Sequence, residues 1–216
     1  HWLLDELSVP SSVRYYRDPE YRAECNREAN RRCCEVLGIA PFAEICPAHE
    51  PKRIEQVLGA EWEIMEGGTP WLMPTLDTTE KIAATLDELE DAPDDALRER
   101  FEIGSAMAQT GQTTSGWSRG PATIATSVLG TEVAVMLCVD EPDLMERFFR
   151  VLADLLVRMH RLRAAWDGKE VLGVGILDDN CALFSPGLYR RFCFPVWQTL
   201  ARELAPEPGD MRYQHS

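Results

Sequence analysis

The sequence contains no apolar stretch that reaches about 18 residues without a charge, and no signal peptide opens it. We therefore expect a cytoplasmic protein without a membrane segment. Basic residues are also scarce, because 22 Lys and Arg stand against 36 Asp and Glu and leave a net charge of −14. This acidity argues against nucleic acid or an anionic membrane as a partner.

The common signatures of nucleotide binding and catalysis are missing too: GxGxxG, the Walker loop, HExxH and GxSxG are all absent. The glycines of "GVGIL" (173–177) lie inside an apolar run instead of after it, so nucleotide binding has no support. No CxxC pair occurs. The cysteines are expected to be reduced thiols used as small apolar residues; they are Cys25, Cys33, Cys34, Cys46, Cys138, Cys181 and Cys193.

What is present is an alternation of helical and extended patterns, with no repeat, low-complexity tract or long linker to divide the chain. Ser185 and Pro186 form an N-cap and first-turn pair, and Asp77 with Glu80 forms a capping box. Propensity alone predicts a strand over "TEVAVMLCV" (131–139). The other expected helices are 18–38, 51–59, 77–91, 93–111, 142–168 and 185–204, and the other expected strands are 40–46, 61–65, 112–116, 171–177 and 211–216.

Strands that alternate with helices of ten or more residues imply parallel βαβ units. Either a doubly wound sheet or a barrel could follow, and in both the working residues lie at the carboxyl ends of the strands. Asp178, Asp179 and His215 occupy such ends. The sequence therefore directs attention to these three side chains.

Each of these residues has a functional and a structural interpretation. Neighbouring carboxylates repel, so Asp178 and Asp179 could include an acid of raised pKa or could bind a cation together. They could equally serve a turn or cap before Ser185. His215 could be a base, an anion ligand or a metal ligand, or an ordinary polar residue at a strand end.

Three further polar residues lie elsewhere in the chain. Glu44 has apolar neighbours on both sides, so its carboxylate must find a partner or point into a cleft. His49 is expected in a loop. His160 is expected on the surface of a helix.

The segment "VGILDDNCALFSPGLYRRFCFPVW" (174–197) resembles the uroporphyrinogen decarboxylase family, in which a strand ends in Asp and a small polar residue. A Leu-Ser-x-x-x-Tyr-x-x-Phe-x-x-Pro pattern then follows, matched here by Phe184, Ser185, Tyr189, Phe192 and Pro195. "GPATIATSVLG" (120–130) is similar to the family's Gly-x-Pro-x-Thr-x-Ala stretch, and 42–70 is similar to its Phe-Ser-Asp-Ile segment.

This resemblance implies an α/β fold, a (β/α)₈ TIM barrel whose active site lies at the carboxyl ends of the strands. Residues 1–39 would be a helical lead-in and 40–216 a partial barrel, incomplete at the C-terminus. The resemblance also implies that 131–139 is largely helical, against the propensity.

The resemblance assigns roles residue by residue. Glu44 stands where the family has its catalytic aspartate, and Asp178 is the strand-end acid; both would hold pyrrole N–H groups. Asp179 replaces the usual Ser or Thr, and we include it among the catalytic candidates. Ser127 falls at the family's active-site tyrosine and, with His215, is a substrate-binding candidate. The Arg-Gln-Ala-Gly-Arg motif is not found.

These matches imply a carbon–carbon lyase of porphyrin biosynthesis that decarboxylates a porphyrinogen or related carboxylated substrate without a cofactor. Corrinoid methyltransferases share the superfamily and carry a His-x-Cys at a comparable strand end. His215 and Ser216 fit its first two positions, and zinc would be the cofactor and a corrinoid protein the partner. A third alternative is a non-catalytic binding protein on the same barrel. The substrate would be tetrapyrrole-like or a methyl donor, and a homodimer stays open.

Overall fold

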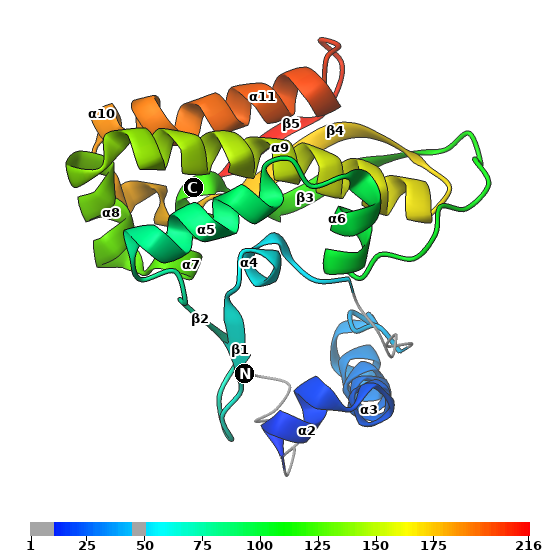
Figure 1. Ribbon diagram of the computed structural model, residues 1–216. Coiled ribbons are helices and arrows are strands. Elements are labelled where there is room, and N and C mark those ends of the chain that lie inside the picture. The colour runs from blue at the N-terminus through cyan, green and yellow to red at the C-terminus, as the bar shows by residue number, and fades with distance from the viewer. Residues whose placement is uncertain (1–10, 45–50) are drawn as a thin grey trace. The chain divides into compact units, whose positions relative to one another are not determined.

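The computed structural model describes residues 11–44 and 51–216 (Figure 1). The chain divides into two compact units. One comprises residues 1–50 and 62–73, and the other comprises residues 51–61 and 74–216. We call them the N-terminal unit and the C-terminal unit, and each is described by itself.

The N-terminal unit contains the helices α2 (Ser12–Arg17) and α3 (Pro19–Leu37) and, except for Glu61, a two-stranded sheet of β1 (Glu61–Glu63) and β2 (Trp71–Met73). The Asp18 side chain accepts a hydrogen bond from the backbone N–H of Tyr21, and Pro19 occupies the first turn of α3. Gly38 ends the helix in a left-handed conformation, with φ of 71°. The expected helix at 18–38 is therefore confirmed.

The expected strand at 40–46 is wrong over residues 40–44, which are irregular, and its last two residues lie outside the described part. The cause is the side chain of Asn30. Its Nδ2 donates to the Phe42 carbonyl at 2.8 Å, and its Oδ1 accepts from the Phe42 N–H at 2.9 Å. The asparagine thus occupies the backbone groups that strand pairing would use.

The C-terminal unit is built on a three-stranded parallel sheet, in the order β3 (Thr113–Arg119), β4 (Glu170–Leu177) and β5 (Arg212–His215). Helices α7 (Pro121–Leu129), α8 (Thr131–Asp140) and α9 (Pro142–Trp166) connect β3 to β4. A 3₁₀ turn η1 (Asp179–Leu183), α10 (Pro186–Leu188), a π-helical turn η2 (Tyr189–Cys193) and α11 (Phe194–Leu204) connect β4 to β5. The predicted parallel βαβ units are confirmed. A complete barrel stays a prediction, because the described residues contribute three strands to this sheet.

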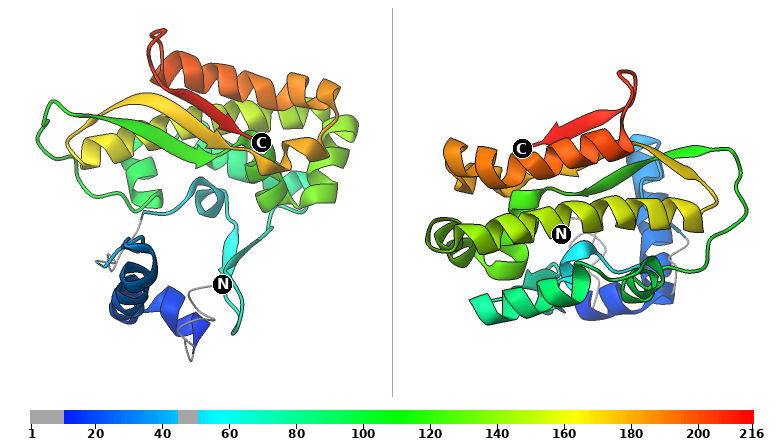
Figure 2. Two further views of the ribbon diagram at one scale, coloured as in Figure 1. Left: turned by 180° about the vertical axis from the view of Figure 1, so that it is seen from behind. Right: turned by 45° about the horizontal axis from the view of Figure 1, so that its top comes forward.

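One face of the sheet is covered by α9 and α11, and Figure 2 shows the strands from the opposite side. The predicted apolar stripe of α9 is buried, with Phe148, Leu152 and Leu155 fully inaccessible. On the uncovered face, Trp117, Gly175 and Tyr213 form one row across the three strands. The rings of Trp117 and Tyr213 lie 5.5 Å apart, centroid to centroid. The sheet therefore has one packed face and one face with exposed aromatic side chains.

The segment at 131–139 is helical, so the propensity-based strand is wrong and the helix implied by the family resemblance is confirmed. Ala134 and Cys138 are the buried residues of α8, four positions apart, whereas Met136 and Val139 are exposed. This is a helical period. Strand propensity largely reflects how a side chain packs in a sheet, and α8 packs against α7 and α9 instead.

The described part of the unit also contains α4 (Ile54–Val57), α5 (Thr79–Leu89) and α6 (Asp94–Arg100). Helix α5 begins after Thr78, whose hydroxyl accepts from the Lys81 N–H, so Thr78 is the cap in place of the expected Asp77. Helix α6 ends at Arg100, well before the expected residue 111, and Glu102 just after it takes a positive φ of 54°. Backbone conformation at one residue therefore ends a helix that periodicity extends.

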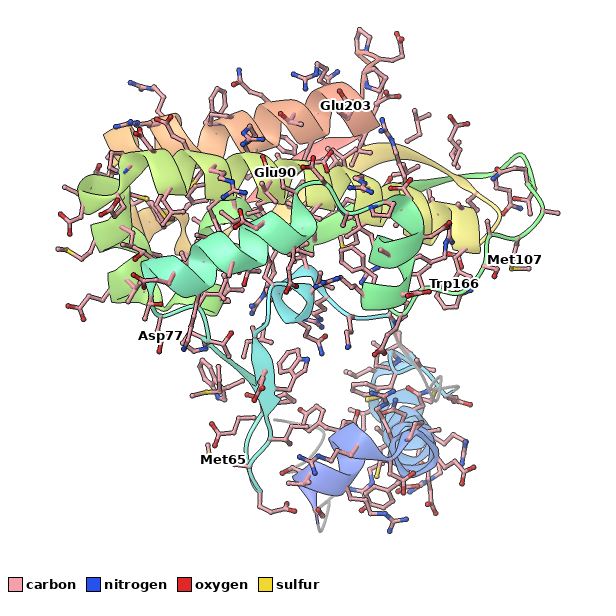
Figure 3. All side chains as sticks on the ribbon, in the orientation of Figure 1. Met65, Asp77, Glu90, Met107, Trp166 and Glu203 are labelled. Atoms are coloured by element: carbon pink, nitrogen blue, oxygen red, sulfur yellow. The ribbon has the colours of Figure 1, made fainter. Side chains whose placement is uncertain are left out.

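Acidic side chains on the helical surfaces pair with arginines. Glu90 contacts Arg147 and Arg150 at 2.7 and 2.6 Å, and Glu203 contacts Arg161 at 3.1 Å. Figure 3 labels both glutamates. Within the described residues, no single helix has the length and apolar composition to cross a membrane. Helices α7 and α8 pass such a test only as a pair, bent by 105°.

Candidate functional site

The carboxyl ends of the three parallel strands meet in one row. Arg119 of β3 lies beside Leu177 of β4, which lies beside His215 of β5. Asp178 follows directly, and its backbone N–H donates to the His215 carbonyl at 2.7 Å. The predicted grouping of Asp178, Asp179 and His215 at this edge is therefore confirmed.

Asp178 is fully buried, and both of its carboxylate oxygens have donors. Oδ1 accepts from the backbone N–H of Thr123 at 2.9 Å, and Oδ2 accepts from the hydroxyl of Tyr189 at 3.1 Å. Burial raises the pKa of Asp178, and these hydrogen bonds oppose that rise. Thr123 belongs to the first turn of α7. Asp178, which follows β4, therefore caps the N-terminus of a helix that is distant from it in the sequence.

Gly120 makes this arrangement sterically feasible. A Cβ added at Gly120 would lie 2.3 Å from both Cβ and Cγ of Asp178. The glycine adopts φ of −83°, which any residue can adopt, so the requirement is for space and not for conformation. The absence of a side chain at Gly120, just before α7, therefore leaves the space that the Asp178 side chain occupies.

Tyr189 joins Asp178 to β5. Its hydroxyl donates to Asp178 and accepts from Nε2 of Gln214 at 2.9 Å. Burial raises the pKa of Tyr189, and the negative charge of Asp178 raises it further, so the hydroxyl stays protonated. The residue lies in the π-helical turn η2, a geometry that is frequent at functional sites.

Asp179 has the opposite environment to its neighbour. Its side chain is 63% exposed, and Oδ1 lies 2.9 Å from Nδ1 of His215, whose side chain is 57% exposed. A carboxylate that accepts from Nδ1–H leaves Nε2 of the imidazole open for a proton or a ligand. The two adjacent acids thus have different roles: Asp178 binds Thr123 and Tyr189 in the interior, and Asp179 contacts His215 at the surface.

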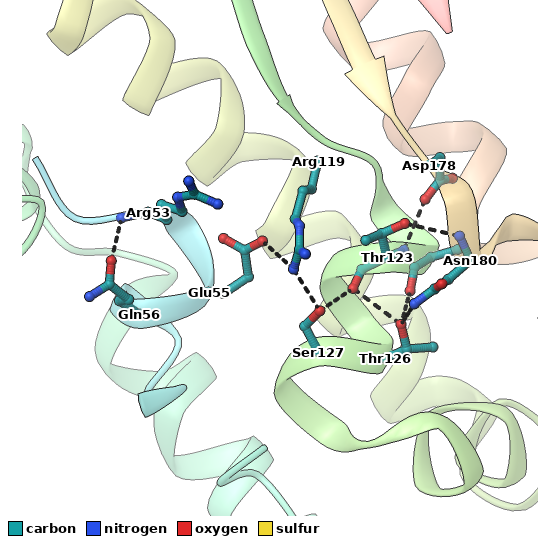
Figure 4. A network of polar contacts seen from close by, with 10 residues as sticks. Arg53, Glu55, Gln56, Arg119, Thr123, Thr126, Ser127, Asp178 and Asn180 are labelled. Carbon is teal, nitrogen blue, oxygen red and sulfur yellow. Dashed lines mark hydrogen bonds and ion pairs between the residues drawn. The ribbon is translucent and has the colours of Figure 1, made fainter. Parts of the chain in front are cut away.

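Ser127 belongs to a polar network that runs back to Thr123 (Figure 4). Its hydroxyl donates to the Thr123 carbonyl at 2.7 Å and accepts from Arg119 at 3.0 Å. Arg119 also lies 3.5 Å from the buried carboxylate of Glu55. The sequence reasoning missed Arg119 and Glu55, although Arg119 ends a strand and could have been found by the rule that identified Asp178.

Asn180 fastens the turn η1 to α7. Its backbone N–H donates to the Thr123 hydroxyl at 3.2 Å, and its Nδ2 donates to the Thr126 hydroxyl at 2.7 Å. These contacts hold the residues that follow Asp178 against the helix that Asp178 caps. The position of Asp179 is therefore set by its neighbours on both sides.

Two of the residues singled out from sequence lie apart from this row. Glu44 belongs to the N-terminal unit, where it is exposed and accepts from Nδ2 of Asn30 at 2.9 Å. Its role with Asp178 stays a prediction. His160, expected on a helix surface, is buried: its ring packs on Gly116, and Nε2 lies 3.4 Å from the Ser118 hydroxyl. The expectation for His160 is wrong, because the flat surface of a glycine in β3 leaves room for the ring. His49 lies outside the described residues.

Metal binding would need several converging ligands. In the part of the chain that the structure describes, no three His, Cys, Asp or Glu side chains are grouped so as to hold a metal ion. The six described cysteines are free, and four of them are buried. The described residues therefore do not supply a zinc ligand set around His215.

Comparison with known proteins points to one family. The sequence model of Uroporphyrinogen decarboxylase (URO-D) matches residues 53–212. A methyltransferase from Methanosarcina mazei has a similar structure, with a TM-score of 0.52, 15% sequence identity, and coverage of 99% of this chain and 60% of that protein. At this identity the likeness concerns the fold alone, and the chain spans about 60% of the length of that neighbour. No curated protein sequence matches. Because the family match extends over more than half of its residues, the chain belongs to the uroporphyrinogen decarboxylase family.

Proposed function

We propose that the chain acts in the decarboxylation of a porphyrinogen-like or related carboxylated substrate at the carboxyl edge of its sheet. The observation that carries this proposal is the exposed Asp179–His215 pair, hydrogen-bonded at 2.9 Å beside the buried Asp178. A carboxylate-oriented imidazole transfers protons, and a decarboxylation needs a proton at the carbon that loses CO₂. Family membership supports the reaction class.

The chemistry follows from these groups. The bond between the substrate carbon and its carboxylate breaks, CO₂ leaves, and the electron pair remains on the carbon, which then accepts a proton. His215 would deliver that proton from Nε2. Asp179 would stabilise the imidazolium and any positive charge that develops on the substrate.

Asp178 takes a positioning role in this proposal. Its oxygens are occupied by Thr123 and Tyr189, and its side chain is inaccessible in this structure. It would hold α7, η2 and the edge of β5 in register, so that Asp179 and His215 keep their geometry. Glu44 remains a candidate for binding pyrrole N–H groups, as the family resemblance implies.

The test is turnover of a porphyrinogen with acetate side chains, followed by chromatography of the oxidised products. His215→Gln and Asp179→Asn should each lower kcat/KM by about 10²-fold or more, the usual contribution of a general acid. Asp140→Asn, an exposed aspartate at the end of α8, is the matched control and should leave turnover unchanged. Unchanged turnover in both site variants would contradict the assignment.

Methyl transfer with a corrinoid partner is the second candidate, and the geometry of His215 favours it. A histidine whose Nδ1 is held by a carboxylate presents Nε2 in the manner of a metal ligand. Among the described residues, His215 has no further side chains grouped with it that would complete a zinc ligand set. Elemental analysis decides between the candidates: one equivalent of zinc that is lost in His215→Ala supports methyl transfer. If the protein is metal-free and does not turn over a porphyrinogen, both enzymatic candidates weaken and the non-catalytic binding protein gains weight.

A further inference from the structure

A cavity of about 280 Å³ lies beside β3 in the C-terminal unit, and three arginines line it: Arg53, Arg119 and Arg163. Among the described residues, Glu55 is the one carboxylate in its lining. Figure 4 shows Arg53 and Arg119 on either side of Glu55. The lining thus gathers three guanidinium groups and one carboxylate, within a protein that is strongly acidic as a whole.

Arg163 is the least compensated of these charges. Its terminal nitrogen donates to the Lys52 carbonyl at 2.8 Å, and its Nε is buried without a hydrogen-bond partner. No carboxylate of the described residues forms an ion pair with it. Burial lowers the pKa of Arg163, the positive charge of Arg53 lowers it further, and the negative charge of Glu55 opposes this shift. A partly buried guanidinium without a direct ion pair is unfavourable, and an anion in the cavity would relieve it.

Arg119 and Glu55 do not neutralise the site between them. Their separation of 3.5 Å is long for an ion pair, and Arg119 makes its shorter contact, 3.0 Å, with the neutral hydroxyl of Ser127. Glu55 itself is almost fully buried. The long contact of Arg119 with Glu55 and the unpartnered Nε of Arg163 leave these two guanidinium groups with donors for a second anion.

We propose that this cavity binds a single oxyanion group, a carboxylate or a phosphate, held by Arg119 and Arg163. Guanidinium groups suit such anions because their planar donors match two oxygens at once. The volume is below the range of about 300–1,000 Å³ usual for whole drug-sized ligands, so one anionic arm fits. These arginines do not belong to an Arg-Gln-Ala-Gly-Arg motif, which is not found in the sequence.

The position of the cavity suggests what it would bind, and this extension rests on the proposed function. Arg119 ends β3 and His215 ends β5, with one strand between them. Neighbouring strands lie about 4.8 Å apart, so the two ends are separated by about 10 Å. A substrate with several carboxylates could place one arm in the cavity while another part reaches the Asp179–His215 pair.

Isothermal titration of the full chain at low ionic strength tests the site, with inorganic phosphate and malonate as the two probes. Arg119→Met and Arg163→Met should each weaken binding by about tenfold or more. Arg161→Met is the matched control, since Arg161 lies on the same helix as Arg163 but pairs with Glu203 at the surface. It should bind as the wild type does. The probe with the lower Kd shows whether the site prefers a carboxylate or a phosphate.

The absence of saturable heat with both probes would overturn the proposal, as would an equal loss of affinity in Arg161→Met, which indicates unspecific charge screening. Urea denaturation of each variant verifies that it is folded. His215→Gln should keep the binding of the probe. If that variant and the wild type bind the anion but neither decarboxylates a porphyrinogen, the anion site stands and the proposed function fails.

Discussion

Replacing Gly120 with alanine should destabilise the protein by a contact that no sequence pattern reveals. The new Cβ would lie 2.3 Å from Cβ and Cγ of Asp178 and 2.6 Å from its Oδ1. The acid cannot yield easily, because Thr123 and Tyr189 hold its two oxygens. Either the backbone of α7 shifts away from β4, or Asp178 leaves its donors.

Both outcomes have a known scale. Overpacking a buried site costs about 1–3 kcal/mol, and a lost hydrogen bond to a charged group costs about 1.5–3 kcal/mol. Since movement of Asp178 relieves part of the overlap, we expect Gly120→Ala to lower the free energy of unfolding by about 3–5 kcal/mol. In a chain of this size the melting temperature would fall by about 6–20 °C.

Urea denaturation followed by circular dichroism measures this loss, and Gly187→Ala is the control. At Gly187 the nearest atom to an added Cβ is the Ser185 hydroxyl oxygen at 3.9 Å, so the methyl group enters open space in α10. That variant should be unchanged or up to about 1 kcal/mol more stable, from its higher helix propensity. A Gly120→Ala variant within about 0.5 kcal/mol of the wild type would refute the steric argument.

Three further predictions concern single side chains. Tyr189→Phe should lower the free energy of unfolding by about 1–3 kcal/mol in urea, because Asp178 loses a buried donor; equal stability would contradict the contact. Tyr213→Phe is its exposed counterpart and should change little. Ser185→Ala should cost about 1 kcal/mol, since the hydroxyl caps α10, and a silent substitution would mean that the cap is dispensable. Burial first, and then the charge of a nearby arginine, lower the pKa of His160 from 6.5 to about 4, so the unfolded chain binds a proton that the folded protein excludes. Stability should therefore be lost as the pH falls from about 6.5 to about 4, by roughly 3 kcal/mol, and His160→Gln should flatten that part of the profile.

Local signals in the sequence were sufficient for much of the fold. The caps at Asp18 and Ser185 act within one turn of their own helices, so tertiary contacts are not needed to recognise them. The apolar period of α9 and the continuous apolar run of β4 also report on burial directly. From these patterns came the parallel βαβ units and the prediction that Asp178, Asp179 and His215 share an edge.

Interactions between distant residues decided the rest. The irregular course around Phe42 depends on a side chain twelve positions earlier, Asn30, which no strand propensity includes. The helical state of 131–139 depends on its packing against α7 and α9. The burial of His160 depends on Gly116 in a different element.

The sequence by itself determined that two adjacent acids end a buried strand and that a histidine ends the next. Only the tertiary structure decided that these acids differ: Asp178 caps α7 in the interior, and Asp179 pairs with His215 at the surface. Successive side chains leave a strand end in different directions, so their environments come from whatever packs there. The same holds for the arginines, which are far apart in the chain and meet around one cavity through the packing of α4, β3 and α9.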